Sequence, residues 1–552
     1  MSEMRVNRRA ALGLFGAGAA LPGMASAESA SPVAFDHGVA SGDPTSRGAI
    51  LWTRVATQGD APVRVQWNVA ESDGGTPIEH GSTQARPARD FTVKVEARRL
   101  KPGHDYVYWF EANGTRSPTG RFRTLPVGGT TDVAMAVTSC QLYGNGLFNA
   151  HDAIAKEERL DAVLFLGDYI YEYEPRDYGG ANAAHLNRIA APDHEIVSLN
   201  DYRTRHAAYK TDPNLQAAHA RAAWVCVWDD HEVANDSWTG GAQNHQPETE
   251  GAWAIRKAAA MQAYFEWMPI RDPVPGKPWD AINRSFEFGD LATLAMVETR
   301  LLARSQQADD VVKPVDGPSI ARVLAERSRP DRELLGEPQR RWLDGVLRAS
   351  VDAGKPWQIL GNQVVMARVP GPDIEKLLGA EKARVMLSSL DPKIRKSVAT
   401  AQAGFRAGLP YNLDSWDGYP AARERLYAGF RAAGSHPIVL SGDSHAFWAN
   451  DLFDDKGKLV AAEFATSAIT SPSVGDSLPG VPLGALLEAA GDEVIFCDQS
   501  AKGYIRLTLM RDTARADFVA VSTILAKTYD TTTIARFDIS SAGRSDRLKR
   551  AL

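Results

Sequence analysis

Two kinds of apolar pattern divide this chain. From residue 32 to about residue 127, short segments alternate apolar and polar residues and are separated by turn residues, which predicts strands at 48–53, 63–68, 91–95 and 106–110. Alternation of this kind is typical of antiparallel sheets with one covered face. We therefore expect a small all-β sandwich in this part of the chain.

After residue 130 the strands are predicted by unbroken apolar runs instead. Four such runs lie at 133–140, 161–173, 224–232 and 437–445, and segments with helical spacing lie between them, for example 149–159, 253–267 and 339–353. Strands buried on both faces and alternating with helices are typical of a layered α/β domain. We expect an N-terminal β-sandwich at 32–127, a linker at 126–130 and an α/β domain at 130–552.

Each of the four runs ends in residues that bind metals. Within the segment 161–173, the apolar residues of the strand end at Gly167, and Asp168 follows. Glycine permits a sharp turn of the backbone and a close approach to a ligand. Asp230, Asp443 and His445 come at the ends of two other runs. Taken singly, each residue could be an ordinary solvated carboxylate or a hydrogen-bonded histidine, and we keep that interpretation for Asp229. Together they predict two metal ions a few Å apart, with Asp168 as the bridging ligand.

Composition narrows the function. The 552-residue chain has a formal net charge of -6 and a pI near 6.1, so it has no basic footprint for nucleic acid. Its three cysteines allow at most one disulfide. Cys226 and Cys497 lie in apolar surroundings and are predicted to be buried structural residues, whereas Cys140 ends the first buried run.

The first 27 residues have the form of an export signal. Arg5, Arg8 and Arg9 precede an apolar run at 10–22, and Ala-Ser-Ala at 25–27 fits a cleavage site. The adjacent arginines fit a twin-arginine signal, which implies the Tat export machinery as a partner. No other run is long enough to cross a membrane, so we expect a periplasmic or secreted protein.

The order of these motifs carries a family resemblance. Gly-Asp at 167–168, Asp-Asp-His-Glu at 229–232 and Gly-Asp-Ser-His at 442–445 resemble the dinuclear site of the calcineurin-like metallophosphoesterase superfamily. Where that superfamily usually has Asn and His, this chain has Asp230 and Asp443, and Cys140 replaces its first Asp-x-His. These departures, with the segments 35–44, 51–54 and 415–420, resemble the PhoD-like alkaline phosphatase/phosphodiesterase family over nearly the whole chain.

The resemblance implies a fold and a ligand set. The expected fold is a layered α/β metallophosphoesterase sandwich with an N-terminal domain of the fibronectin or Ig type, in which 100–106 resembles a fibronectin corner with Tyr106 as its tyrosine. The family pattern implies an Fe(III) ion and calcium, the iron bound by Cys140, Asp168, Tyr171 and His445, and the calcium by Asp168, Asp230 and Asp443. Asn235 is a further candidate for contact with metal or substrate. Glu298 stands where the family commonly has Asp.

The function that follows is an exported phosphoesterase, an alkaline phosphatase/phosphodiesterase that hydrolyses phosphomonoesters and phosphodiesters by metal-activated hydroxide. His231 is the catalytic candidate: it protonates the departing alkoxide or stabilises its charge, or alternatively it orients Asp230. Two alternatives remain open, a phospholipase D-like phosphodiesterase on the same scaffold and a non-catalytic surface binding protein stabilised by its metals.

Overall fold

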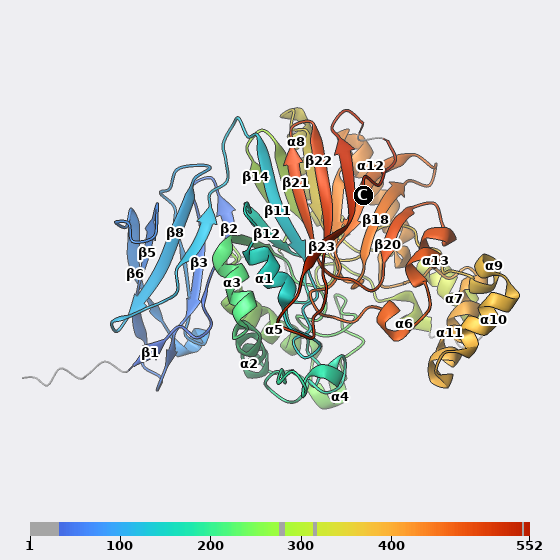
Figure 1. Cartoon of the computed structure of the whole chain (residues 1–552), viewed down its shortest axis with the longest axis horizontal. Coiled ribbons are helices and arrows are strands. Elements are labelled where there is room, and N and C mark those ends of the chain that lie inside the picture. Colours follow the sequence, from blue (N-terminus) through green and yellow to red (C-terminus); the bar gives the residue numbers. More distant parts are fainter. Residues whose placement is uncertain (1–31, 275–281, 313–316, 544–545) are drawn as a thin grey trace, which may run out of the picture.

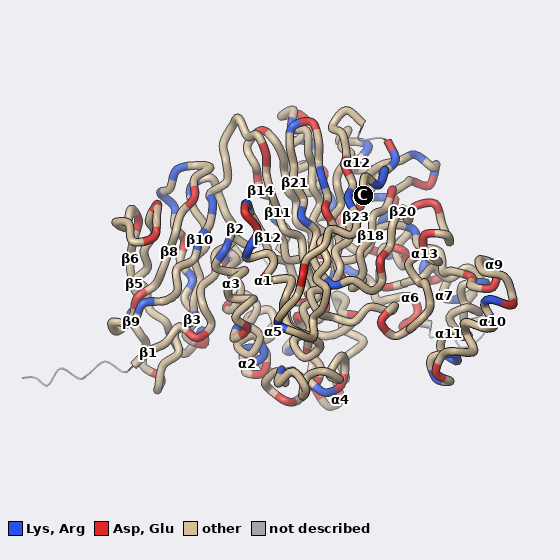
Figure 2. The backbone as a smooth tube through the Cα atoms, viewed as in Figure 1, with Lys and Arg blue, Asp and Glu red and all other residues tan. Residues whose placement is uncertain are grey.

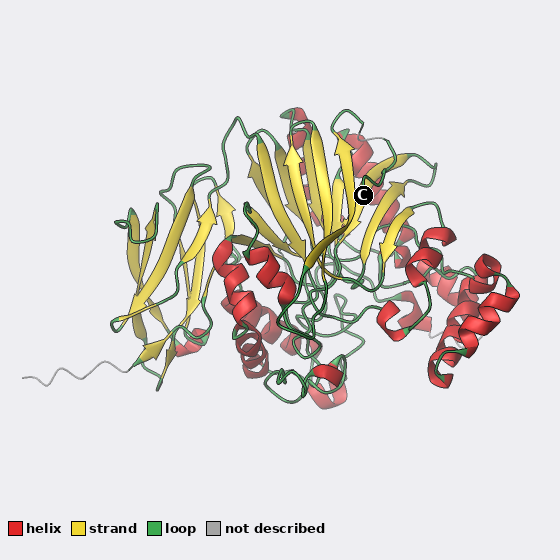
Figure 3. Ribbon diagram, in the orientation of Figure 1, coloured by secondary structure: helices red, strands yellow, loops and turns green. Residues whose placement is uncertain are grey.

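A computed structural model describes residues 32–274, 282–312, 317–543 and 546–552. Two large sheets lie in the centre of the molecule, helices flank them, and a smaller β-rich part made by the N-terminal residues lies at one side (Figures 1 and 3). The predicted mixed α/β composition with a β-rich N-terminal region is confirmed. The expected export signal at 1–27 lies outside the described residues.

The N-terminal part contains ten strands. The four predicted segments all form strands, with bounds slightly longer than or shifted from those expected. Their bounds are β1 Val33–Ala34, β2 Val39–Thr45, β3 Gly48–Arg54, β4 Ala56–Thr57, β5 Val63–Ala70, β6 Glu79–Ala85, β7 Thr92–Glu96, β8 Asp105–Ala112, β9 Thr115–Arg116 and β10 Gly120–Arg123. Strands β10, β8, β5 and β6 form one sheet, with β9 paired to β8, and β2, β3 and β7 belong to another.

That second sheet continues into the rest of the molecule. Its strand order is β23-β22-β21-β11-β12-β13-β2-β3-β7, and β13 pairs in parallel with β2, so that Ala223 lies opposite Ser41. The apolar alternation predicted the N-terminal strands but not this pairing across 182 residues of sequence. The other strands are β11 Asp132–Thr138, β12 Ala162–Phe165, β13 Ala223–Cys226, β21 Lys502–Met510, β22 Thr513–Val521 and β23 Thr531–Ser540.

A seven-stranded sheet packs against this nine-stranded one. Its order is β14-β15-β16-β17-β19-β18-β20, in which β15, β16, β17 and β19 run parallel. Leu164 and Phe165 of β12 share one core cluster with Leu440 of β17 and Phe464 of β19. The strands of this sheet are β14 Arg284–Phe288, β15 Ala292–Met296, β16 Trp357–Gly361, β17 Ile438–Ser441, β18 Phe447–Phe453, β19 Leu459–Ala465 and β20 Val494–Asp498.

Helices cover the outer faces of the two sheets. Helices α1 to α3 and α5 lie on the side of the nine-stranded sheet, and α8 and α12 pack against strands of the seven-stranded one (Figure 1). Both sheets are thus covered on two faces, which explains the unbroken apolar runs. The helices are α1 Asn149–Ala155, α2 Leu199–Lys210, α3 Pro213–Arg221, α4 Pro247–Glu250, α5 Trp253–Trp267, α6 Ala308–Val312, α7 Gly317–Arg327, α8 Gly336–Asp352, α9 Ile374–Leu378, α10 Ala380–Ser388, α11 Pro392–Arg406, α12 Pro420–Ala433 and α13 Leu483–Ala490.

Several local predictions can be compared with the structure. The Tyr106 hydroxyl accepts a hydrogen bond from the Lys101 backbone N–H at 2.9 Å, the contact expected of a corner tyrosine. Cys226 and Cys497 are buried as predicted, and all three cysteines are free thiols, so no disulfide joins them. Basic and acidic residues are interspersed along the chain (Figure 2). Among the described residues, no helix has the length and hydropathy that crossing a bilayer requires.

Candidate metal centre and active site

The carboxyl ends of strands from both sheets meet at one place. Strands β11, β12 and β13 are parallel neighbours, and the loops that follow them carry Cys140, Asp168 and Asp230. Strand β17 of the other sheet delivers Asp443 and His445 to the same place. The prediction that the ends of the four apolar runs converge is therefore confirmed, and the structure shows that they converge from two sheets.

Four of the predicted ligands have a left-handed backbone. Cys140, Asp168, Asp443 and His445 have φ values of 60°, 58°, 60° and 57°. Residues with a Cβ atom avoid this region at a cost of about 1–2 kcal/mol each, so such conformations concentrate at functional sites. The left-handed residues let each loop reverse directly after its strand, and their side chains reach a common point.

The turn after β12 is held by a buried carboxylate. Glu232 accepts hydrogen bonds from the backbone N–H groups of Asp168 at 3.1 Å, Tyr169 at 2.5 Å and Asp229 at 2.8 Å. Gly167 has a φ of 108°, and a Cβ there would lie 2.5 Å from the Cβ of Asp229. The sharp turn at this glycine is as predicted, but the close approach that it permits is to Asp229 in the loop after strand β13 rather than to a ligand.

Among the residues that the structure describes, three groups of side chains have potential ligand atoms within 4.8 Å of one another. They are Cys140 with Asp168 and His445, Asp168 with Asp230 and His231, and Asp229 with Asp230 and Asp443. Asp168 and Asp230 each belong to two groups. Buried Asp168 also has one oxygen, Oδ1, with no hydrogen-bond partner. An unpaired anionic oxygen next to thiol, imidazole and carboxylate donors is the chemistry of a metal site, so the residues present fit metal ions.

Tyr171 lies beside the first of these groups. Its hydroxyl donates a hydrogen bond to Asp168 Oδ2 at 2.9 Å and lies 3.2 Å from His445 Nε2 and 2.7 Å from Ser471 Oγ. Burial, and next the charge of Asp168, raise the pKa values of Cys140 and of Tyr171 well above their usual range. Both groups are therefore protonated unless a metal ion displaces the proton.

His231 forms a buried pair with Glu172. Its Nδ1 lies 2.7 Å from Glu172 Oε2, and the other Glu172 oxygen accepts from the Asn235 backbone N–H and the Asn244 amide. Burial lowers the pKa of His231, but the charges of Glu172 and Asp230 outweigh it and raise the pKa well above its usual range. The imidazole therefore carries a proton beside the ligand groups, and its ring packs 4.2 Å from that of Tyr171.

Arg300 forms ion pairs with several acidic residues of the site. Its guanidinium is fully buried and forms ion pairs with Asp229, with Asp414 at 2.7 Å and with Asp443 at 2.9 Å, and it lies 3.7 Å from Asp230. Our interpretation of Asp229 as a solvated carboxylate is wrong, because Asp229 is 1% exposed and paired with this arginine. The apolar pattern gave no sign of that partner, which lies 71 residues away.

Glu298 fixes the turn that carries Arg300. It accepts hydrogen bonds from the backbone N–H groups of Arg300, Leu301 and Leu302 at 2.6–2.8 Å and from the Trp228 indole at 3.0 Å. Glu298 is fully buried. This carboxylate therefore orients backbone rather than a ligand, and the longer side chain spans the turn with both oxygens in use.

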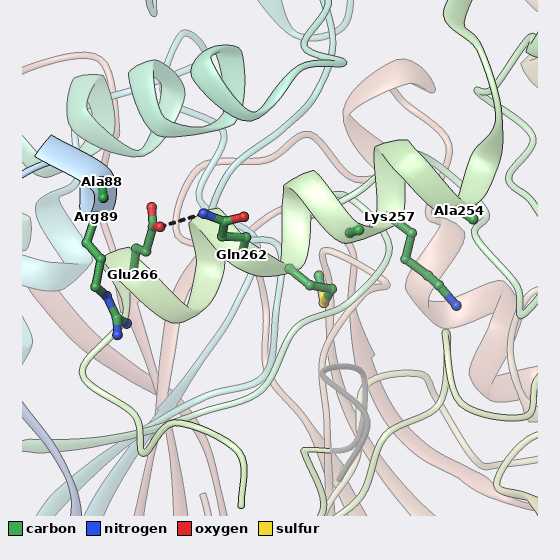
Figure 4. A pocket seen from close by; sticks show the side chains of 8 residues that line it. Ala88, Arg89, Ala254, Lys257, Gln262 and Glu266 are labelled. Atoms are coloured by element: carbon green, nitrogen blue, oxygen red, sulfur yellow. Dashed lines mark hydrogen bonds between the residues drawn. The ribbon is translucent and has the colours of Figure 1, made fainter. Parts of the chain in front are cut away.

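A cavity of about 440 Å³ opens over these residues. It is lined by candidate ligands, by His231 and Asn235, and by further polar and aromatic side chains, among them Tyr173, Tyr178, Asp236, Gln307, Asp309, Tyr411, Asn412 and Asp414. A second cavity of about 430 Å³ follows helix α5, where Gln262 donates to Glu266 (Figure 4). Its lining contains none of the predicted site residues. The chemistry therefore belongs to the first cavity.

Comparison with known protein families shows to which family this chain belongs. Residues 135–518 match the model of the PhoD-like phosphatase family, and residues 20–126 match that of the family's N-terminal domain. The chain belongs to the PhoD-like phosphatase family. It is therefore a phosphoester hydrolase that acts on phosphate esters, as the sequence resemblance predicted.

Two relatives support this membership over most of the chain. Alkaline phosphatase D of Bacillus subtilis (strain 168) is 35% identical over 503 residues, which cover 88% of this chain and 77% of the relative. A solved structure described as that of PhoD is 31% identical, with a TM-score of 0.77, and covers 94% of this chain and 92% of that one. These matches do not favour the alternative of a non-catalytic surface binding protein.

The structure brings most of the predicted residues of this PhoD-like phosphatase together. Asn235 lies at the cavity, where its amide donates to Gln243 at 3.0 Å, and it is outside the three ligand groups of the described residues. Sequence reasoning missed Glu172, Arg300 and Asp414. Glu172 follows Tyr171 directly, and a carboxylate between two aromatic residues in a buried stretch was a signal that could have marked it.

Proposed function

We propose that this phosphatase is exported and hydrolyses both phosphomonoesters and phosphodiesters at the cavity over Asp168. The observation that carries the proposal is the set of three candidate ligand groups at that cavity, in which Asp168 links the first to the second and Asp230 links the second to the third. Groups that share ligands suit two ions acting on one phosphoryl group. Asp168 bridges these ions in the proposal, because it lies between the group with Cys140 and the group with Asp230.

We assign Fe(III) to Cys140, Asp168, Tyr171 and His445, and calcium to Asp168, Asp230 and Asp443. Thiolate and phenolate are anionic donors suited to ferric iron, whereas calcium prefers carboxylate oxygens. When bound, the ions would activate water and neutralise charge on the phosphoryl oxygens. Burial raises the pKa of Asp443 well above its usual range, so binding of a cation there is coupled to loss of a proton.

The protein's own residues supply a proton and a fixed geometry. His231, held protonated by Glu172, is placed to give a proton to the departing alkoxide. Arg300 holds Asp443 and Asp229 in place, and Glu232 holds the turn at Asp168. Asn235 remains a proposed contact to substrate or metal, since it lines the cavity.

A substrate panel tests this function. The purified protein is expected to release p-nitrophenol from p-nitrophenyl phosphate and from bis-p-nitrophenyl phosphate, and chelator treatment is expected to abolish both reactions. Activity on neither ester after reconstitution with iron and calcium would refute the proposal. Preferential cleavage of phosphatidylcholine would instead favour the phospholipase D-like alternative.

Colour tests the metal assignment. Ligation of Fe(III) by a thiolate and a phenolate produces visible absorption, which zinc with its filled d shell lacks. Tyr171→Phe is expected to shift or weaken that band, and Cys140→Ser to change it differently. A colourless, fully active protein with two equivalents of zinc would show the iron assignment to be wrong.

Export through the Tat machinery and a periplasmic or secreted location are also part of the proposal. Their support is the pattern of residues 1–27, with Arg8 and Arg9 before an apolar run. The double variant Arg8→Lys, Arg9→Lys is expected to stay in the cytoplasm.

The domain division at 32–127 and 130–552 is proposed on the loop at 126–130, in which Val127 is 71% exposed.

A further inference from the structure

The loop after strand β19 supports three of the four residues that we assign to iron. The backbone N–H groups of Thr470 and Ser471 donate to the Cys140 carbonyl at 3.4 and 3.3 Å. His445 Nδ1 donates to the Pro472 carbonyl at 2.8 Å, which turns Nε2 toward the other ligand groups. The third contact is made by the Ser471 side chain, and it reaches a ligand atom directly.

The Ser471 hydroxyl is fully buried among polar groups. Its Oγ accepts a hydrogen bond from the Leu142 backbone N–H at 3.1 Å. The same Oγ lies 2.7 Å from the Tyr171 hydroxyl oxygen and 2.9 Å from the Cys140 carbonyl oxygen. A hydroxyl has a single proton, so Ser471 donates to one of these two oxygens at a time.

The number of available protons assigns that donation to Tyr171. The Tyr171 hydroxyl gives its own proton to Asp168 Oδ2 at 2.9 Å, so only Ser471 can supply a proton between the two hydroxyl oxygens. The Cys140 carbonyl does not need this proton, because two backbone N–H groups donate to it. A phenolate that binds a metal ion has no proton to give and is a stronger acceptor, so the same arrangement is then reinforced.

We propose that Ser471 is a positioning residue of the metal centre, which holds the Tyr171 oxygen toward iron and stabilises its negative charge. This inference rests on the proposed function, because Tyr171 is a ligand only in the proposed iron assignment. A hydrogen bond withdraws electron density from a phenolate oxygen and lowers the energy of the electrons that visible light promotes to the metal. The Ser471 hydroxyl therefore keeps the visible band at a shorter wavelength than Tyr171 without this partner would give.

Removal of the hydroxyl tests the proposal. In Ser471→Ala, we expect the visible band to move to longer wavelength. We also expect iron affinity, measured by competition with a hydroxamate chelator, to fall by about 10- to 100-fold. The position of the band does not depend on the fraction of folded protein, so partial unfolding of the variant leaves this measurement valid. In a Tyr171→Phe background, Ser471→Ala should not move the remaining thiolate band, because the acceptor is gone.

Thr470→Val is the matched control. Thr470 is equally buried, and its hydroxyl donates to the Leu142 carbonyl at 2.8 Å. The substitution therefore removes a hydroxyl that connects the same two loops but keeps the contact between Ser471 and Tyr171. We expect the wild-type band position in this variant. Equal shifts in Thr470→Val and Ser471→Ala would overturn the proposal, since both would then act by bracing the loop.

Hydrolysis of p-nitrophenyl phosphate by the same preparations separates the possible failures. A band that moves in Ser471→Ala but not in Thr470→Val supports the positioning role, and absence of hydrolysis in the wild type would then refute the proposed function alone. An unmoved band in Ser471→Ala would overturn the role of Ser471 and leave the function intact. A wild-type protein without visible absorption would overturn the iron assignment together with this inference.

Discussion

Two buried polar regions lie on either side of the turn after strand β12, and they handle charge in opposite ways. On one side, Asp168 joins the carboxylates around Arg300. On the other, the Tyr169 hydroxyl contacts His219 at 2.8 Å, and Lys210 Nζ lies 3.3 Å from the same imidazole nitrogen. Both regions are largely buried, yet only the first opens into a cavity.

The difference lies in what compensates each charge. Burial lowers the pKa of Lys210 to about 7 and that of His206 to about 3, so both side chains lose their charge as the pH rises above neutral. Lys210 packs 4.5 Å from the Trp52 ring of strand β3, which makes this region the contact between the N-terminal strands and helix α2. In the first region burial raises the pKa values of Asp229 and Asp443 well above their usual range, but both carboxyl groups lie against the buried Arg300 guanidinium and His231 stays protonated. Converging acidic ligand atoms beside a cavity distinguish the first region as the candidate metal site.

The largest effect is expected from removing the bridging carboxylate. Asp168→Asn leaves both proposed ions without a shared ligand, so both should be lost, and turnover should fall by more than about 1,000-fold. Metal analysis of the purified variant measures this directly, with Asp193→Asn, at a side chain 77% exposed, as the control. Two ions at full occupancy and continued turnover would show that Asp168 does not bridge.

A large, substrate-dependent effect is expected from His231→Ala. General acid catalysis contributes about 100- to 10,000-fold, and less when the departing alkoxide is already stable. The variant should keep its metals and lose much more activity with alkyl phosphates than with p-nitrophenyl phosphate. Glu172→Gln should show the same trend more weakly, because it removes only the partner of the imidazole. Equal losses of activity with both substrates would contradict the general acid role of His231 and favour the alternative, in which His231 orients Asp230.

A loss of folding stability is expected from Arg300→Gln. Removing one partner of a buried ion pair costs about 3–5 kcal/mol of stability, because Asp229 is left unpaired while Asp414 keeps only Arg304. Urea unfolding of the metal-loaded protein measures this cost. Arg300→Lys retains the charge but cannot reach three carboxylates, so it should fall between wild type and Arg300→Gln. Wild-type stability in the glutamine variant would contradict the stabilising role of the ion pairs of Arg300.

The smallest effect, and one on stability alone, is expected at Lys210. Its folded pKa of about 7 lies below the ordinary value of 10.5, so the folded state binds fewer protons than the unfolded state between these pH values. The penalty is absent above about pH 10.5, grows as the pH falls, and is complete below about pH 7, where it reaches at most about 5 kcal/mol. Lys210→Met should therefore raise Tm at pH 6.5 more than at pH 9.5, with turnover unchanged. The same shift at both pH values would contradict burial of an uncharged lysine.

The sequence by itself determined the strands and the residues that form the candidate metal site. A strand covered on both faces must be apolar throughout, so its end is visible where Asp168 or Asp443 interrupts the run. The motif order predicted the family for the same reason, since the candidate ligands lie at fixed strand ends. The Tyr106 corner was equally local, because its hydroxyl bonds to backbone five residues away.

Only the tertiary structure decided which charges are paired and which are left over. Asp229 and Asp230 are identical neighbours in sequence, and the position of Arg300, brought in after strand β15, assigns Asp229 to an ion pair. The parallel pairing of β13 with β2 and the meeting of two sheets were likewise invisible in the sequence. Such contacts depend on packing between segments that lie tens to hundreds of residues apart in the sequence. Apolar periodicity predicts which residues are buried, but not which other segment they pack against.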